Sequence, residues 1–144
     1  MSGVLKTFAF ALIVAPAIAH AESTINARLQ DSATAAGGAT MRIVLDHDRV
    51  KAGRTTLRAH NESGHLVHEL IVVQIDPKQA ELPYDEKSAT VVEERIRSLG
   101  EISDLAPGAS GTLAVNLKPG SYLLICNQPG HYKAGMAARL SVVK

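Results

Sequence analysis

Short apolar segments separated by turn residues run through the chain from residue 41 to its end. Residues 111–117 alternate between apolar positions and small or polar ones, which is typical of a strand with one buried face. Residues 118–120, Lys-Pro-Gly, fit a tight turn, because proline fixes φ and glycine tolerates positive φ. The other predicted strands are residues 41–45, 55–59, 65–75, 122–126 and 139–143. Many short strands joined by glycine and proline turns predict an all-β sandwich or a small barrel.

Two of the predicted strands are apolar on both faces. Residues 70–73 and 122–125 are apolar without interruption, although alternate side chains of a strand point to opposite faces of its sheet. A further segment must therefore cover the outer face. Residues 77–103 interrupt the strand pattern as an insertion, and residues 90–99 within it could form a short helix. We expect this stretch to pack on the outer face through Val91, Val92, Ile96 and Leu99.

The first 21 residues have the pattern of a secretory signal peptide. Lys6 precedes a short apolar segment, and small residues follow it with two overlapping Ala-x-Ala cleavage sites. One site predicts cleavage before His20, and the other, which we favour, predicts cleavage before Glu22. The apolar segment is too short for a membrane-spanning helix. We therefore expect residues 1–21 to be removed and residues 22–144 to form one exported domain in a bacterial periplasm.

Composition and charge exclude several classes of function. A chain of 144 residues is long enough for one domain and too short for a multidomain enzyme. The 15 basic and 14 acidic side chains give a net charge of +1, which offers no electrostatic basis for binding nucleic acid or an anionic membrane. A single cysteine excludes an intramolecular disulfide and a four-cysteine zinc site. We expect a small domain without a membrane span, whose one thiol has another use.

The candidate chemistry lies between the last two predicted strands. Cys126, His131 and Met136 are separated by four residues each, and a thiolate, an imidazole and a weak thioether suit copper better than a hard cation. One more imidazole would complete a plane of two histidines and one cysteine with a distant axial methionine. His68, on the predicted strand 65–75, is the best candidate. A lone cysteine is ordinarily a core residue, but an exported protein gains nothing obvious from an unpaired thiol. Zinc, which also binds cysteine and histidine, is an alternative metal.

Together these motifs resemble the cupredoxins, the type 1 blue copper proteins that include plastocyanin and azurin. The resemblance extends from about residue 41 to residue 144, and the spacing of the ligand loop is similar to that of rusticyanin. It is carried by Asn61 and His68, the Pro119-Gly120-x-Tyr122 turn and the Cys126-x4-His131-x4-Met136 loop. The resemblance implies a Greek-key β-sandwich with copper near one end.

The resemblance also implies a role for each motif residue. His68, Cys126, His131 and Met136 would be the ligands of one type 1 copper ion per chain, with the thiolate giving an intense blue charge-transfer band. His131, on a loop near the surface, would be the port through which electrons enter and leave. Asn61 looks like the asparagine that pins the turn before the first histidine ligand.

For two residues beside the predicted ligands, Asn127 and Glu69, the sequence predicts specific contacts. Asn127 follows the cysteine and could order the loop through hydrogen bonds around the thiolate. Residue 69 is Glu, where azurin and plastocyanin have an asparagine that ties the two ligand segments together. On a strand Glu69 should point away from His68, so we expect it to be solvated or salt-bridged. A glutamate ligand, as in the red copper protein nitrosocyanin, is the alternative.

The remaining histidines suggest a second idea. His47, His60 and His65 are expected at the surface. Alternatively they form an additional weak copper site, which would suit copper resistance or delivery. If cleavage falls before His20, that residue becomes N-terminal, and its amine and imidazole could chelate copper(II) together.

Two functions are compatible with these residues. The first is a monomeric periplasmic electron carrier, whose partner would be a redox protein such as a c-type cytochrome or a copper or haem oxidase or reductase. The second is copper sequestration, delivery or tolerance with a copper-trafficking partner. A copper enzyme is not expected, because one Cys-His-Met site comes with no second copper motif and no His-Cys-His bridge of the oxidase type.

Overall fold

The first main sheet combines strands from the N-terminal half with one later strand. In the computed structural model, which describes residues 22–33, 39–79 and 81–144, its strand order is β2-β1-β4-β9. β1 and β4 are parallel, and the other neighbours are antiparallel. The bounds are Ser23–Ala33 for β1, Ala39–Leu45 for β2, Gly53–Asn61 for β4 and Ser110–Leu117 for β9. The predicted signal peptide, residues 1–21, lies outside the described residues.

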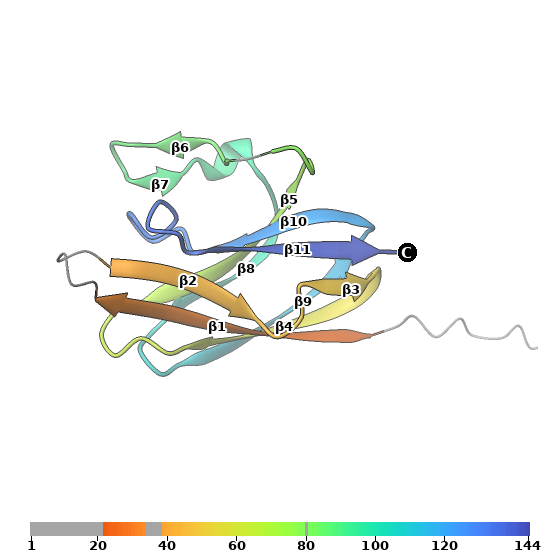
Figure 1. The fold of residues 1–144 in the computed structure, drawn as a ribbon, viewed down its shortest axis with the longest axis horizontal. Helices are drawn as coiled ribbons and strands as arrows, with labels where there is room; N and C mark the ends of the chain where they lie inside the picture. Colours follow the sequence, from red (N-terminus) through yellow and green to blue (C-terminus); the bar gives the residue numbers. More distant parts are fainter. Residues whose placement is uncertain (1–21, 34–38, 80) are drawn as a thin grey trace, which may run out of the picture.

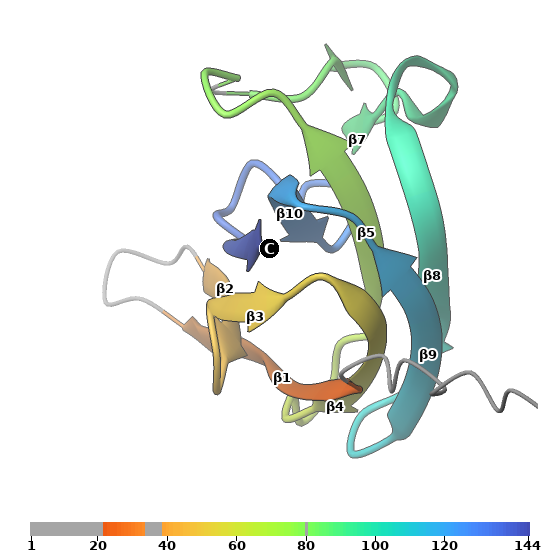
Figure 2. The same ribbon diagram turned by 90° about the vertical axis from the view of Figure 1, so that its right-hand side faces the viewer.

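The second main sheet contains the apolar strands and lies against the first. Its order is β3-β11-β10-β5-β8, with β3 parallel to β11 and the other neighbours antiparallel. The bounds are Arg49–Lys51 for β3, His68–Ile75 for β5, Arg97–Leu105 for β8, Gly120–Ile125 for β10 and Ala137–Val143 for β11. The two sheets face each other as layers (Figures 1 and 2), which confirms the predicted all-β Greek-key sandwich.

The core between the two sheets is almost entirely aliphatic. Leucine, isoleucine and valine side chains from both sheets fill it, and Tyr122 is its one buried aromatic residue among those the structure describes. The Tyr122 hydroxyl donates to the Lys118 carbonyl at 2.8 Å and accepts from the Lys118 N–H at 3.1 Å. The predicted turn at residues 118–120 is thereby fixed, and it carries the chain from β9 in one sheet to β10 in the other.

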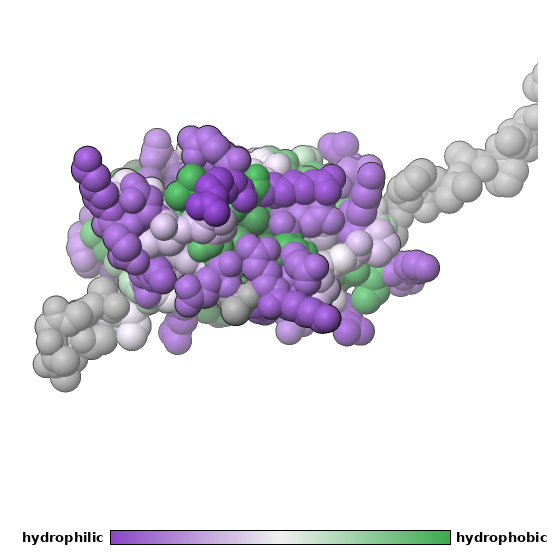
Figure 3. All heavy atoms as spheres, turned by 90° about the horizontal axis from the view of Figure 1, so that it is seen from above, coloured by the Kyte–Doolittle hydropathy of each residue, from purple (hydrophilic) through white to green (hydrophobic). Residues whose placement is uncertain are grey.

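A small outer layer covers the second sheet, as its two-sided apolar strands predict. It consists of β6 (Tyr84–Asp85), β7 (Thr90–Val91) and a single 3₁₀ turn (Glu93–Arg95), which lie above the sandwich in Figure 1. Val91 and Ile96 pack there with apolar residues of β5 and β10. Seen from above, the molecule presents a mainly hydrophilic surface with small hydrophobic areas (Figure 3).

Part of the prediction for this segment is corrected. Residues 90–99 contain one 3₁₀ turn instead of a longer helix, and from Arg97 onward the chain is the edge strand β8, paired with β5. Leu99 accordingly packs against the core between the main sheets, not on the outer face. Within β8 the alternation is itself irregular, because the pairing of β5 and β8 shifts register twice.

β1 is the longest strand and is not among the predicted ones. It pairs with β2 on one side and β4 on the other, so it lies inside its sheet. Ile25, Ala27 and Leu29 alternate along it and are buried. The strands of the described residues therefore start at residue 23, well before the start of the resemblance. Within the described ranges, no helix has the length and hydropathy that crossing a bilayer requires.

Candidate metal centre

Adjacent strands bring His68 and Cys126 to the same end of the second sheet. His68 is the first residue of β5, and Cys126 directly follows β10. These strands are antiparallel neighbours, with Ile71 opposite Ile125, so the start of one lies beside the end of the other. Both side chains are fully buried.

The turn before His68 is held by the buried side chain of Asn61. Its amide nitrogen donates to the carbonyls of Leu66 and Leu105, both at 2.8 Å, and its amide oxygen accepts the N–H of Ser63 at 2.9 Å. One side chain thus joins the end of β4, the turn and the end of β8. These are the contacts expected of a residue that pins this turn.

The predicted ligand loop between β10 and β11 is closed by its own backbone. The N–H of Cys126 donates to the Met136 carbonyl at 3.1 Å, and the N–H of Met136 donates to the His131 carbonyl at 3.0 Å. Gly135 has φ +97°, and a Cβ there would lie 3.2 Å from the Met41 carbonyl oxygen, so glycine permits both the conformation and the close approach. The loop therefore returns Met136 to the side of Cys126.

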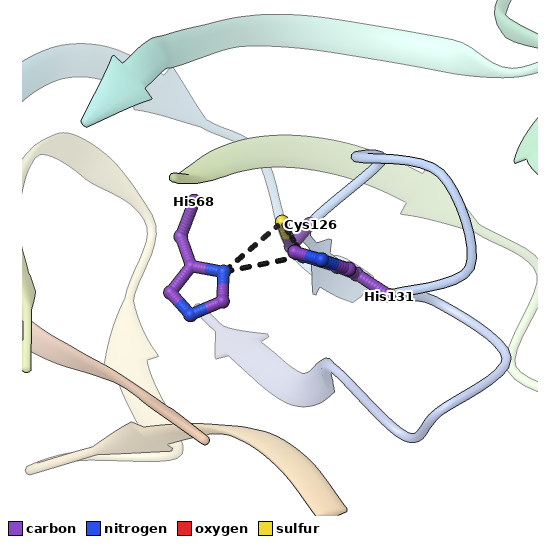
Figure 4. Close-up of side chains that lie close together, drawn as sticks. All are labelled: His68, Cys126 and His131. Atoms are coloured by element: carbon purple, nitrogen blue, oxygen red, sulfur yellow. Dashed lines mark hydrogen bonds between the residues drawn. The ribbon is translucent and has the colours of Figure 1, made fainter. Parts of the chain in front are cut away.

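Three of the four predicted ligands direct donor atoms at one another (Figure 4). His68 Nδ1 lies 3.2 Å from His131 Nδ1 and 3.9 Å from Cys126 Sγ, and the His131 Nδ1 to Cys126 Sγ distance is 3.4 Å. Donors that share one ion at about 2.0–2.3 Å in a trigonal plane lie about 3.5–3.7 Å apart. The triangle is close to this size, so His68, Cys126 and His131 fit one type 1 copper ion.

Met136, the predicted axial ligand, is fully buried and belongs to the same apolar cluster as Cys126. Its carbonyl accepts the backbone N–H of Cys126 at 3.1 Å, so the two residues are neighbours. A thioether is a weak, soft donor of the kind that completes a copper site with two histidines and one cysteine. The burial of Met136 and its place in the loop agree with this role, and Met136 remains the predicted axial ligand.

The thiol of Cys126 is held in its neutral form in the absence of metal. Burial raises the pKa of Cys126 to about 11, and the nearby charge of Glu69 acts in the same direction. The backbone N–H groups of Gln128 and Glu69 oppose this rise, and that of Glu69 lies 3.4 Å from the sulfur. A bound cation must displace the thiol proton to gain the thiolate as a ligand.

His131 is the one partly exposed member of the converging group. Burial lowers its pKa below the ordinary histidine value, and the neighbouring positive charge of His68, when protonated, lowers it further. A neutral imidazole with a bare nitrogen is the form that binds a metal. His131 therefore combines a ligand-competent ring with access to solvent.

Glu69 differs from the expectation of a solvated or salt-bridged side chain. Its carboxylate accepts the backbone N–H of Asn127 at 2.9 Å, while its own N–H points to Cys126 Sγ. Glu69 thus ties the two ligand segments together, the role the resemblance assigns to an asparagine at this position. Its burial raises the pKa of the Glu69 carboxyl, only partly offset by the Asn127 N–H. The carboxylate does not belong to the converging donor group.

Asn127 connects the ligand loop to the outer layer. Its side-chain oxygen accepts the N–H of Val91 at 2.6 Å, and its amide nitrogen donates to the Val91 carbonyl at 3.1 Å and to the Glu93 carboxylate at 2.8 Å. The Gly130 N–H also donates to the Ala89 carbonyl at 2.7 Å. These side-chain hydrogen bonds run to the outer layer and not to the sulfur, and the ordering of the loop by Asn127 stays a prediction.

Asp31, on β1, is a residue of the site that was not predicted. Its carboxylate lies 3.2 Å from His68 Nε2, on the side of the ring away from Cys126. Burial would raise the pKa of Asp31, but hydrogen bonds with Ser63 and His68 and the charges of His68 and His65 bring it below its ordinary value. Nothing in the local sequence marks it, because it is 37 residues from His68 and in the other sheet.

Each of the other described histidines contacts a different residue. His47 contacts Asp46 at 3.1 Å, His60 contacts Ser110 at 2.8 Å, and the exposed His65 lies 3.9 Å from Asp31. Within the residues that the structure describes, they do not form a second cluster of converging donors. His20, the alternative N-terminal ligand, lies outside those residues.

The sequence matches no family model, and it matches no curated protein. Solved structures are nevertheless similar to it. Reduced auracyanin from Roseiflexus castenholzii superposes with a TM-score of 0.57 at 19% identity, covering 85% of this chain and 97% of the other. Auracyanin B gives 0.58 at 20% identity, covering 91% and 94%. Rusticyanin from Thiobacillus ferrooxidans gives 0.58 at 18% identity, covering 83% and 76%. The chain therefore has the cupredoxin fold.

Proposed function

We propose that this protein is a type 1 blue copper protein that carries one electron between redox partners. The observation that carries the proposal is the convergence of His68 Nδ1, Cys126 Sγ and His131 Nδ1 at one end of the sandwich, beside the buried Met136. Bound copper would supply the Cu(I)/Cu(II) couple. The similar structures are named as auracyanin and rusticyanin, and rusticyanin is described as a copper protein.

The firm positions of the donor residues favour fast electron transfer. His68 and Cys126 belong to neighbouring strands, and the loop with His131 is tied to Glu69 and to the outer layer. Donors fixed this firmly would surround Cu(I) and Cu(II) in nearly the same way, so little rearrangement accompanies electron exchange. The partly exposed His131 is the electron port, and Cys126 supplies the covalent thiolate connection to the sheet.

Location and partners follow from the same proposal. The N-terminal signal pattern supports export to the periplasm, with residues 22–144 as the working domain. There the protein would act as a monomer with a c-type cytochrome or a copper or haem oxidase or reductase, and not as an enzyme itself. Copper sequestration or delivery ranks second, because the surface histidines within the described ranges form no second donor cluster.

Voltammetry of the copper-loaded protein, together with its electron self-exchange rate, separates the two functions. A carrier gives a reversible one-electron wave and fast self-exchange, and it keeps its copper against a chelator during cycling. An irreversible wave, or loss of copper in one oxidation state, would contradict electron carriage and favour copper handling.

Replacing Met136 by leucine should leave copper bound but raise the reduction potential, because an axial donor to Cu(II) is lost. Each tenfold by which Cu(II) loses more affinity than Cu(I) raises the potential by about 59 mV. Met41→Leu is the matched control, since Met41 packs on the core and a methionine-to-leucine exchange usually costs less than about 1.5 kcal/mol. An unchanged potential in Met136→Leu would show that Met136 is not axial.

Copper binding should release a proton from the thiol. At about pH 7.5 a thiol whose pKa is about 11 is almost fully protonated, and the ligand form is the thiolate. Calorimetric titration in buffers of different ionisation enthalpy counts the protons released per ion. Cys126→Ala should release one proton fewer than the unmodified protein. Equal proton counts for the two proteins would mean that the thiol is not deprotonated on binding.

A further inference from the structure

The strand at the start of the fold contributes a carboxylate to the far side of the proposed centre. Asp31 lies near the end of β1, in the sheet opposite the one that carries His68. Its side chain is only 7% exposed, and its Oδ1 lies 3.2 Å from Nε2 of the fully buried His68. A buried carboxylate in hydrogen-bond contact with a buried imidazole is a specific arrangement, because neither group is stable in the interior without a partner.

The contact decides which nitrogen of His68 carries the proton. An ionised carboxylate can only accept hydrogen bonds, so Nε2 must donate to Asp31. In a neutral imidazole the other nitrogen, Nδ1, is then bare, and Nδ1 is the atom that faces Cys126 and His131. With the proton on Nδ1 instead, His68 would present a hydrogen to the site and could not act as a ligand.

Asp31 is itself held in place by the turn that precedes His68. The Ser63 hydroxyl oxygen accepts the backbone N–H groups of His65 at 3.2 Å and Leu66 at 2.9 Å. Its hydrogen is therefore free to point toward the Asp31 carboxylate, and the Ser63 hydroxyl is among the groups that lower the pKa of Asp31. Since Asn61 in turn fixes Ser63, the carboxylate, the turn and His68 form one connected network.

We propose that Asp31 is a positioning residue that fixes the orientation and the Nε2–H tautomer of His68 and whose charge favours Cu(II) over Cu(I) at the centre. The part concerning copper rests on the proposed function, whereas the tautomer is a property of the metal-free protein. A carboxylate behind a metal-bound histidine makes the imidazole a stronger donor. A negative charge this close also stabilises the more positive of the two oxidation states.

Two substitutions of Asp31 separate the effect of its hydrogen bond to His68 from the effect of its negative charge. Asp31→Asn keeps an oxygen that can accept from Nε2 but removes the charge, and Asp31→Ala removes both. Asp46→Asn is the matched control, because Asp46 also contacts a histidine, His47, but at the exposed side near Asn26. Thermal melting of each variant establishes that it is folded.

The first readout is the nitrogen-15 NMR pattern of the His68 ring in the metal-free protein at about pH 8, where an ordinary histidine is neutral. We expect the Nε2–H tautomer in the unmodified protein, Asp31→Asn and Asp46→Asn, and a mixture of tautomers in Asp31→Ala. An unchanged pattern in Asp31→Ala would overturn the positioning role, whether or not the protein binds copper.

The second readout is copper affinity and reduction potential. Asp31→Ala should bind copper about 10- to 100-fold more weakly. Both Asp31 variants should have a higher potential than Asp46→Asn, by about 59 mV for each tenfold by which Cu(II) loses more affinity than Cu(I). Potentials equal to that of Asp46→Asn would overturn the charge effect. Failure of the unmodified protein to bind copper through its thiolate would overturn the proposed function and the copper part of this inference together.

Discussion

Replacing Cys126 by serine should abolish the intense visible absorption of the copper-loaded protein. The band requires a bond between copper and a thiolate, and Cys126 is the only cysteine in the chain. Its sulfur is one of the three converging donors and is fully buried, so no other thiol can take its place. An alkoxide donor does not supply the same charge transfer. Absorption spectra at equal copper content, with copper measured independently, test this prediction.

The control for this experiment is a substitution in the same loop that keeps the thiolate. Met136→Leu should retain the band, although its potential changes. Circular dichroism must show that the Cys126→Ser protein is folded, because its hydroxyl enters an apolar site. A folded Cys126→Ser protein that keeps the intense band would contradict the assignment of Cys126 as a ligand.

Replacing Asn61 by alanine should destabilise the protein by about 3 kcal/mol, because each buried polar group left without a partner costs about 1–3 kcal/mol. The substitution would leave the carbonyls of Leu66 and Leu105 and the N–H of Ser63 without their present partner. It would also loosen the turn before His68, so copper affinity should fall as well. Urea unfolding of the metal-free protein measures the first effect, and a competition titration measures the second.

Asn116→Ala is the matched control for Asn61→Ala. Asn116 is also an asparagine of the first sheet, but its side chain is exposed on β9. Exposed substitutions of this kind usually change the free energy of unfolding by less than about 0.5 kcal/mol. If the two variants had equal free energies of unfolding, the hydrogen bonds of Asn61 would not stabilise the protein as predicted.

The sequence predicts much of the sandwich because its strands alternate or are uniformly apolar. Strand β1 is not predicted, although the apolar residues Ile25, Ala27 and Leu29 alternate along it. The residues between them, Asn26, Arg28 and Gln30, make the segment polar overall. The insertion is read as partly helical, but residues 90–96 hold only a two-residue strand and one 3₁₀ turn, and after Arg97 the register shifts of β8 disturb its period of two. In both cases the pairing partner, which sequence does not reveal, decides the conformation.

The ligand loop is predictable because its donors lie within eleven consecutive residues. Glu69 and Asp31 are different, since their roles depend on segments that only folding brings near. Glu69 lies where β5 and β8 shift register, so simple alternation does not describe its surroundings, and the backbone of Asn127 passes within 2.9 Å of its carboxylate. Asp31 contacts His68 across the two sheets, and no spacing rule connects them.

Addition of copper(II) to the purified protein, followed by absorption and EPR spectroscopy, shows whether Cys126, His68 and His131 hold a type 1 copper ion. We expect one equivalent of copper, an intense blue band and the narrow copper hyperfine splitting of a site with two histidines and one thiolate. A pale protein with an ordinary tetragonal copper signal would contradict this expectation, because Cys126 would then not be bound to the metal.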